Sequence, residues 1–257
     1  MSRLILVANR LPVSVDLSDG NVNIQPSNGG LATGMRGLAK AEQTSWVGWP
    51  GAMPSDEQRA TLNDRLAEHS ATPVYLSNQE AARFYEGMSN SVIWPLFHYL
   101  VDRMPLLVED FDEYAAVNER FADAVCAQAR QDDLIWIHDY HLLLLPQILR
   151  SRLPHARIGF FLHIPFPSSE IFRLLPHREE LLRGMLGANL IGFHTFSYAR
   201  HFGDALLGNL GIESELDRVD IQHPAYDVVD SASRAGLTRD LVVLPRLANG
   251  RESGAGA

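Results

Sequence analysis

Short apolar runs alternate with amphipathic segments along most of the chain, and this alternation constrains the fold more than any other feature of the sequence. The runs that have the length and composition of buried strands are residues 4–8, 45–49, 73–76, 134–137, 158–162 and 190–193. The segments predicted to be helices are residues 31–41, 55–67, 112–129, 141–152, 179–186 and 197–210. Strands that alternate with helices at this spacing predict an α/β fold built on a parallel sheet.

A pair of strand-like segments interrupts this alternation after the first strand. Val13–Asp16 and Val22–Gln25 flank Ser18-Asp19-Gly20, which is a turn signal. Two extended segments joined by such a turn predict a β-hairpin.

The composition allows a sizeable core and argues against several classes of partner. Hydrophobic residues make up 46% and charged residues 21% of the 257-residue chain, which suits one large or two small domains. The chain contains no run of eighteen apolar residues, so we expect no membrane partner. A net charge of −9 argues against a nucleic-acid partner, and a homo-oligomer stays open. An anionic ligand must therefore be held by locally placed arginine, histidine and backbone N–H groups.

The single cysteine, Cys126, excludes an internal disulfide. It falls in a predicted helix, where packing explains it better than reactivity. The cytoplasm is therefore the expected compartment.

The character of the sequence changes near residue 220. Residues 222–257 lack clear periodicity, and Asn249–Ala257 has the composition of a linker. We therefore expect one domain over residues 1–220 and an irregular or disordered segment over residues 221–257.

Polar residues follow several of the predicted strands. They are Asn9, Arg10, Asp139, His141, His163, His194 and Thr195. Because ligands of open parallel sheets bind beyond the carboxyl ends of the strands, we expect these residues on one rim that forms a binding site.

Two further segments have a functional and a structural interpretation, and the pattern alone leaves both open. Asn28-Gly29-Gly30-Leu31 places glycines at a predicted helix start, which suits a phosphate but also a plain tight turn. Ser89–Tyr99 sets aromatic residues beside polar ones, which suits the apolar faces and hydroxyl groups of a sugar. A hydrophobic loop packed under the domain has the same composition.

The cluster His138-Asp139-Tyr140-His141, with His98 and His163 elsewhere in the chain, raises the question of a metal site. At a strand end, His138 and Tyr140 would point to one side and Asp139 and His141 to the other. No cysteine or second histidine cluster completes a ligand shell, so we expect no metal.

Asp139 and Glu170 raise the question of a glycoside hydrolase, which needs a pair of carboxylates. Glu170 lies near a predicted helix start, in Pro167-Ser168-Ser169-Glu170. A helix-capping role fits this position better than catalysis.

Several specific strings occur in a fixed order along the chain. They are Ala8–Val13, Asn28–Leu31, Trp46–Trp49, Ser89–Tyr99, Trp136–Leu142 and Phe160–Pro167, and they are extended by Gly192–Thr195 and Ala199–Phe202. Together they resemble the trehalose-6-phosphate synthases of glycosyltransferase family 20, over residues 1 to about 220.

The resemblance implies a GT-B enzyme, which has two Rossmann-like domains and an active site in the cleft between them. This chain would be the N-terminal, acceptor-binding lobe, a Rossmann-like parallel sheet with helices on both faces. Such enzymes transfer glucose from UDP-glucose to glucose-6-phosphate with retention of configuration, and they need no metal and no cofactor.

The matching motif positions imply roles on the acceptor side. Arg10 would contact the acceptor phosphate, and Tyr85 and Trp94 would enclose glucose-6-phosphate. Asp139 would bind an acceptor hydroxyl. Trp49 is a weaker match.

On the donor side, Gly29 and Gly30 would approach the diphosphate of UDP-glucose. His163 would face the transferred glucose near the reacting centre. The resemblance thus implies that Asp139 and His163 are the catalytic residues.

The resemblance ends near Asp220. Family members continue into a second lobe that holds the donor, with an Arg-Leu-Asp-Tyr-type segment, and Gln222–Ala225 does not match the family. We therefore expect an enzyme of this family whose present chain lacks the C-terminal donor-binding lobe. The alternative is a non-catalytic module that binds glucose-6-phosphate or pairs with a separate donor lobe.

Overall fold

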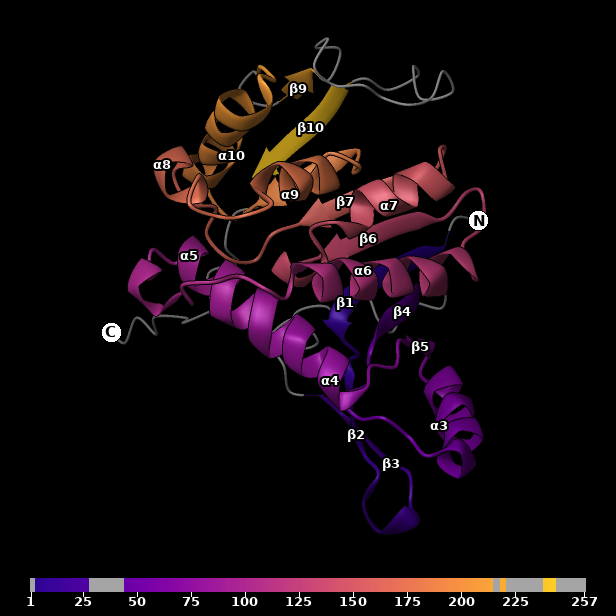
Figure 1. Cartoon of the computed structure of the whole chain (residues 1–257). Coiled ribbons are helices and arrows are strands. Elements are labelled where there is room, and N and C mark those ends of the chain that lie inside the picture. Colours follow the sequence, from indigo (N-terminus) through magenta and orange to yellow (C-terminus); the bar gives the residue numbers. More distant parts are fainter. Residues whose placement is uncertain (1–2, 28–43, 215–217, 221–237, 244–257) are drawn as a thin grey trace, which may run out of the picture.

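The computed structural model describes residues 3–27, 44–214, 218–220 and 238–243, and its main feature is one large sheet. This sheet has eight strands in the order β5-β4-β1-β6-β7-β8-β10-β9, and β2 and β3 form a separate pair (Figure 1). Neighbouring strands of the large sheet are parallel, except that β9 runs antiparallel to β10. The predicted parallel α/β sheet is therefore confirmed.

The bounds of the elements follow the predicted alternation closely. The strands are β1 (Leu4–Arg10), β2 (Val13–Asp16), β3 (Asn23–Pro26), β4 (Thr44–Trp49), β5 (Ala71–Pro73), β6 (Leu134–His138), β7 (Arg157–Phe161), β8 (Leu190–Phe193), β9 (Arg218–Asp220) and β10 (Thr238–Val243). The helices are η1 (Ser18–Gly20), α3 (Asp56–Glu68), α4 (Asn78–Ala81), η2 (Ala82–Ile93), α5 (Trp94–Phe97), η3 (Val101–Arg103), α6 (Phe111–Cys126), η4 (Tyr140–Leu142), α7 (Leu145–Arg152), α8 (Ser169–Phe172), α9 (Arg178–Met185) and α10 (Phe196–Leu210). The antiparallel pairing of β2 with β3 confirms the predicted hairpin.

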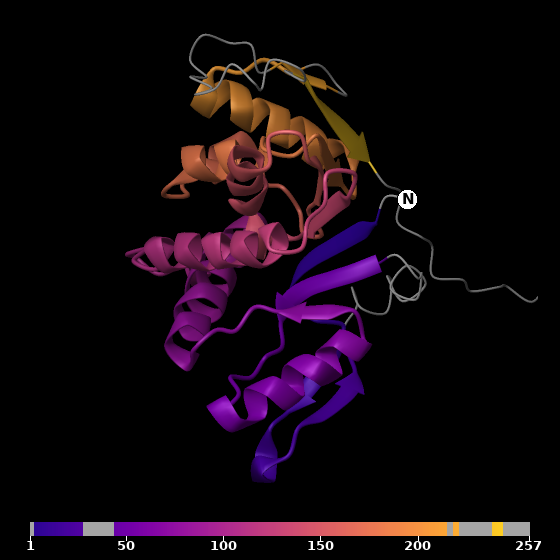
Figure 2. The ribbon, with the colours of Figure 1, turned by 90° about the vertical axis from the view of Figure 1, so that its right-hand side faces the viewer.

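Alternate residues of β1 face two separate cores. Ile5 and Val7 belong to the larger core, which α6, α7, α9 and α10 help to form. Leu6 belongs to a smaller core on the other face, with Leu62 and Leu66 of α3. In Figure 2, the pink helices α6 and α7 lie to one side of the indigo strand β1. Helices thus cover both faces of the sheet, as the resemblance implied.

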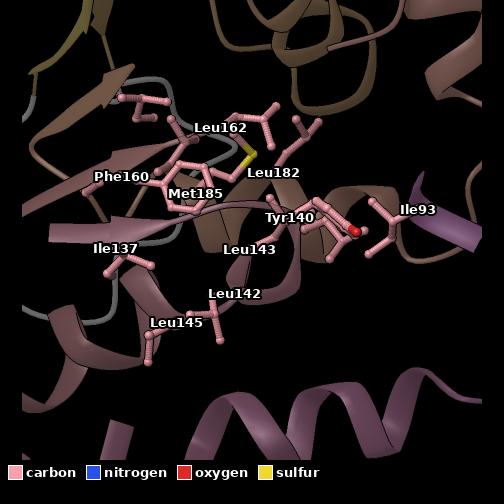
Figure 3. Packing of buried hydrophobic residues seen from close by; sticks show 14 of the residues in the cluster. Ile93, Ile137, Tyr140, Leu142, Leu143, Leu145, Phe160, Leu162, Leu182 and Met185 are labelled. Atoms are coloured by element: carbon pink, nitrogen blue, oxygen red, sulfur yellow. The ribbon is translucent and has the colours of Figure 1, made fainter. Parts of the chain in front are cut away.

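The larger core lies between the central strands and the helices that cover them. Ile137 of β6 and Phe160 of β7 are at most 1% exposed and belong to one cluster with Leu182 and Met185 of α9 (Figure 3). Burial of an aliphatic or aromatic side chain of this size contributes about 1.5–3 kcal/mol. This packing holds β6 and β7, and therefore the residues that follow them, in a fixed position.

The strand order has a topological switch point at β1. The chain continues from β1 to β4 and β5 on one side, and it then crosses to β6, β7 and β8 on the other. Ligands of such sheets bind outside the carboxyl ends of the strands at this point. The polar residues after β1 and β6 therefore occupy the expected ligand position.

The segment Asn78–Phe97 is helical, which the sequence analysis did not predict. Its central part, η2, is a π-helix, and at its end the backbone N–H of Trp94 donates to the carbonyl oxygen of Ser89, five residues earlier. Pro95 lacks an N–H, and its ring clashes with a regular α-helical turn, so it interrupts the ordinary bonding pattern. Of the two interpretations that the sequence left open for Ser89–Tyr99, the packed loop is therefore wrong as far as Phe97.

Three other segments differ from the prediction. Strand β5 begins and ends earlier than residues 73–76, and the helix expected over residues 141–152 is divided into η4 and α7. Thr238–Val243 forms β10, although residues 221–257 were expected to be irregular, because pairing with Leu190–Phe193 satisfies the backbone groups along the outer edge of β8. The helix predicted over residues 31–41 lies outside the described residues.

Candidate functional site

The carboxyl ends of neighbouring strands bring their polar residues to one rim. Arg10 is the last residue of β1, and Asp139 directly follows β6. The backbone N–H of His163, just beyond β7, donates to Oδ1 of Asp139 at 3.2 Å. The rings of His163 and His194, which follows β8, have centroids 5.7 Å apart. The rim predicted from the strand ends is therefore present in the structure.

Arg10 is held by an aromatic ring and a glycine. Its guanidinium carbon lies 4.5 Å from the centroid of the Trp49 ring, a cation–π contact. Gly51 has φ of +88°, and a Cβ at this position would lie 2.5 Å from Nη2 of Arg10. Loss of solvation lowers the pKa of Arg10, and the nearby Tyr85 acts in the opposite direction. An arginine remains charged at neutral pH, so this is a preformed cation whose planar donors suit a phosphate.

The π-helix η2 supplies the aromatic wall beside Arg10. Tyr85 packs edge-on against Trp49, with ring centroids 6.1 Å apart, and stacks on His141 with an interplanar angle of 10°. Asn90 accepts a hydrogen bond from the hydroxyl of Tyr140 at 2.8 Å. In an α-helix, residues 85 and 94 would be about two and a half turns apart and would face opposite sides. The wider turns of η2 change this angle, and within η2 Tyr85 contacts His141 while Asn90 contacts Tyr140, the residue before it.

Asp139 occupies a strained backbone conformation at the centre of the rim. Its φ is 77° and its ψ is 170°, a region used almost only by glycine, at a cost of about 1–3 kcal/mol. Its backbone N–H donates to the carbonyl oxygen of Phe161 at 2.8 Å, and its carboxylate accepts from the backbone N–H of Tyr140 at 3.0 Å. Burial nevertheless raises the pKa of Asp139 to about 6. A carboxylate tuned this close to neutrality is typical of functional sites.

Two histidines meet beside Asp139. Nδ1 of His138 and Nε2 of His163 are 3.0 Å apart, at hydrogen-bonding distance. Burial lowers the pKa of His138 to about 3, and electrostatic repulsion from His163 lowers it further. Burial lowers the pKa of His163 to about 4, and repulsion from His194 acts in the same direction. Both rings are therefore neutral at pH 7.

Several buried polar atoms at this end of the molecule have no hydrogen-bond partner among the described residues. They are Oδ1 of Asn9, Nε1 of Trp49, Nε2 of His138 and both ring nitrogens of His141. An unpaired buried polar atom costs about 1–3 kcal/mol, so such a set is expected where a polar ligand supplies partners for the atoms that it reaches; Nε2 of His138, in a fully buried ring, is not one of these.

The structure brings together most of the predicted site residues. Arg10 and Tyr85 lie on one side of the rim and Asp139 and His163 on the other, whereas the ring of Trp94 stacks on that of His98, with centroids 4.1 Å apart. Gly29 and Gly30 lie outside the described residues.

The contact of His138 with His163 was not predicted from the sequence. Both histidines are among the possible metal ligands in the sequence, and His163 also follows a separate predicted strand. Part of the signal was available, because β6 and β7 are adjacent parallel strands and His138 pairs in register with Phe161, two residues before His163.

The metal site and the glycoside hydrolase, both disfavoured by the sequence, can now be compared with the geometry. Within the described ranges, no group of three or more His, Cys, Asp or Glu side chains lies close enough to hold a metal ion. Asp139 breaks the strand alternation with its positive φ, so His141 turns into the short helix η4, against Tyr140. Glu170 is exposed in the first turn of α8, which suits a capping position.

A Rossmann-like sheet with a cation, a carboxylate and histidines at the carboxyl edge of its switch point is an α/β lobe whose polar residues lie where open parallel sheets bind their ligands. The chain belongs to glycosyltransferase family 20, whose model matches residues 2–229. The resemblance noted in the sequence is therefore confirmed at the level of the family.

Curated relatives and solved structures agree with this assignment. The chain is 46% identical over 227 residues to an alpha,alpha-trehalose-phosphate synthase (UDP-forming) of Emericella nidulans, a match that covers 86% of this chain and 45% of the relative. A trehalose-phosphate synthase from Burkholderia xenovorans in complex with glucose-6-phosphate superposes with a TM-score of 0.72 at 30% identity, covering 95% of this chain and 49% of that one. The N-terminal domain of a Candida albicans trehalose-6-phosphate phosphatase gives a TM-score of 0.76 at 33% identity, covering 95% and 48%.

The chain thus spans about half the length of the proteins it matches. The described helices include none that is long and apolar enough to cross a membrane.

Proposed function

We propose that this chain is the acceptor-binding lobe of a retaining glucosyltransferase, which transfers glucose from UDP-glucose to glucose-6-phosphate and forms trehalose-6-phosphate. The observation that carries the proposal is the placement of Arg10 at the switch point, between the Trp49 ring and Gly51. The names of the relatives and the glucose-6-phosphate in the Burkholderia structure support the same substrates.

The acceptor would lie against Arg10 and the π-helix. The guanidinium of Arg10 pairs with the phosphate of glucose-6-phosphate, since its planar donors match phosphate oxygens. Tyr85 and Trp94 pack on the apolar faces of the sugar, and the carboxylate of Asp139 accepts a hydrogen bond from a sugar hydroxyl. The contact of Tyr85 with Trp49, the ring under Arg10, and the hydrogen bond between Asp139 and His163 support these roles.

The donor would lie on the His163 side of the rim. Gly29 and Gly30 approach the diphosphate of UDP-glucose, and His163 faces the transferred glucose. In the reaction, the bond from the anomeric carbon to the diphosphate breaks and a bond to the acceptor oxygen forms on the same face. The acceptor proton passes to the departing diphosphate, so no protein nucleophile is needed. Asp139 and His163 contribute by positioning and by polar stabilisation of the transition state.

Catalysis would need more than this chain. Relatives are about twice as long, and the donor would be enclosed between this lobe and a second one. We expect the isolated chain to bind glucose-6-phosphate but to release little or no UDP from UDP-glucose plus glucose-6-phosphate. Clear turnover by the isolated chain would contradict the need for a second lobe.

Arg10→Ala tests the acceptor site. Loss of hydrogen bonds from a charged group costs about 1.5–3 kcal/mol, so we expect glucose-6-phosphate to bind roughly 10–100-fold more weakly. Because a ligand stabilises the folded state by an amount set by its concentration relative to Kd, thermal unfolding with increasing glucose-6-phosphate measures this change.

Arg59→Ala is the matched control for this experiment. Arg59 also lies over an aromatic ring, 4.9 Å from the centroid of Tyr75, but on α3 and away from the rim. The stabilisation by glucose-6-phosphate should be retained in Arg59→Ala. Unchanged stabilisation in Arg10→Ala would refute the phosphate assignment.

A non-catalytic module is the second candidate function. The Candida albicans neighbour is named as a phosphatase, so this lobe also occurs in a protein with a different named activity. A module of this kind would bind glucose-6-phosphate and stay inactive even when a donor lobe from a family member is added. UDP release in such a mixture would favour the enzyme. The cytoplasmic location and self-association stay predictions, to be tested by fractionation and by sedimentation.

A further inference from the structure

The contact between His138 and His163 links a buried ring to one that reaches the rim. His138 is the last residue of β6 and is fully buried, whereas His163 is half-buried just beyond β7. Their ring nitrogens, Nδ1 of His138 and Nε2 of His163, are 3.0 Å apart. One ring must therefore donate a proton and the other must accept it.

The surroundings of His138 favour one direction for this hydrogen bond. Its other nitrogen, Nε2, is buried and finds no partner in the described part of the chain. If Nε2 carried the proton, a buried N–H would be left without an acceptor, and such orphaned donors are rarer in proteins than unpaired acceptors. The proton of His138 is therefore favoured on Nδ1, from which it donates to Nε2 of His163.

The direction of this hydrogen bond determines which nitrogen of His163 carries the proton. A neutral His163 that accepts at Nε2 carries its own proton on Nδ1, the nitrogen that the pair leaves uncommitted. A charged His163 would carry protons on both nitrogens and would force the proton of His138 onto the buried Nε2. The ring charge of His194 also disfavours a charged His163.

We propose that His138 is a positioning residue that holds the ring of His163 neutral, in one orientation, with Nδ1–H presented to the ligand. This inference rests on the proposed function, in which His163 faces the transferred glucose. A fixed N–H donor at that place stabilises the negative charge that develops on the departing diphosphate or on a sugar oxygen. His138 acts only through His163, as second-layer partners of functional histidines commonly do.

Nitrogen NMR of the chain labelled with ¹⁵N-histidine tests this proposal, because the ring nitrogens report the tautomer directly. The His163 signals are assigned by their loss in His163→Gln. We expect wild-type His163 to be one tautomer, with the proton on Nδ1 in roughly tenfold excess, and to show no titration between about pH 5 and pH 8.

Two variants at position 138 separate the hydrogen bond from packing. His138→Phe keeps a ring but removes the donor, so the His163 tautomers should approach equal populations. His138→Asn offers an amide N–H in place of Nδ1–H and should restore the Nδ1–H tautomer. His155→Asn makes the same change at an exposed histidine and should leave His163 unaffected.

A wild-type mixture of tautomers, a proton on Nε2 of His163, or an unchanged tautomer in His138→Phe would each overturn the proposal. If His138→Phe does not fold, the wild-type spectrum and His138→Asn still decide. The tautomer is read in the free protein, so this result is independent of ligand binding. Absence of any response to glucose-6-phosphate and UDP-glucose would instead count against the proposed function.

Discussion

Asp139→Asn is expected to stabilise the protein at neutral pH. Burial raises the pKa of Asp139 from 3.8 to about 6, so the folded state resists ionisation of this carboxyl. A raised carboxyl pKa carries no penalty below pH 4, where both states are protonated. The penalty develops as pH rises from about 4 to 6 and is complete above 6. The amide of asparagine keeps the hydrogen bonds from the backbone N–H groups of Tyr140 and His163 and never ionises.

The size of the effect follows from the two pKa values. The difference between 3.8 and about 6 corresponds to an upper limit of roughly 3 kcal/mol at pH 7. Asp139 is half-buried, and screening by water reduces this to about 1–2 kcal/mol. The unfolding midpoint should therefore rise by about 2–8 °C at pH 7 and stay unchanged near pH 4.

Thermal and urea unfolding followed by circular dichroism at pH 4 and pH 7 would measure this difference. Glu80→Gln is the matched control with the opposite sign, because hydrogen bonding to Arg120 lowers the pKa of Glu80 to about 2. The stabilisation by Glu80 is present above pH 4.5 and is lost as pH falls toward 2, so Glu80→Gln should destabilise at pH 7. An Asp139→Asn variant that is no more stable at pH 7, or equally stabilised at pH 4, would refute the reasoning.

Two further predictions concern the support of the rim. Gly51→Ala should destabilise the protein by about 1 kcal/mol or more, because alanine disfavours φ of +88°. It should also weaken glucose-6-phosphate binding, because the new Cβ displaces the guanidinium of Arg10. Thermal unfolding with and without glucose-6-phosphate measures both effects. Tyr114→Phe should cost about 1–3 kcal/mol in urea unfolding, because the buried hydroxyl donates to the carbonyl oxygen of Tyr140 at 2.8 Å and accepts from the N–H of Leu143 at 3.0 Å. A loss below about 0.5 kcal/mol in Tyr114→Phe would contradict this role of the hydroxyl.

The sheet could be predicted because its strands are buried on both faces. Residues 134–137 and 190–193 are compact apolar runs flanked by polar residues, and the structure places strands over them. The rim of polar residues could be predicted from the same pattern, because the carboxyl ends of parallel strands lie at one edge of the sheet. Strand β10 escaped prediction because its short apolar run, Leu241–Val243, is surrounded by sequence without periodicity.

The π-helix could not be predicted from periodicity. Ser89–Tyr99 fits neither the 3.6-residue repeat of an α-helix nor the alternation of a strand, and Pro95 argues against a helix. The tertiary contacts of Tyr85 with His141 and of Asn90 with Tyr140 help to hold a conformation that local propensity does not favour. The roles of Arg10, Tyr85 and Trp94 came from the family resemblance and stay predictions.

The wide turns of η2 make the proposed acceptor site sensitive to the length of one segment. Each residue of a regular helix turns the chain by about 100°. Loss of one residue between Tyr85 and Trp94 would favour an ordinary helix and would change the angle between the two side chains about the helix axis. When homologues are compared, a gap within Ala82–Ile93 should therefore indicate a changed acceptor more reliably than substitutions there. The evolution of acceptor choice in this lobe would then proceed by insertion and deletion as well as by exchange of side chains.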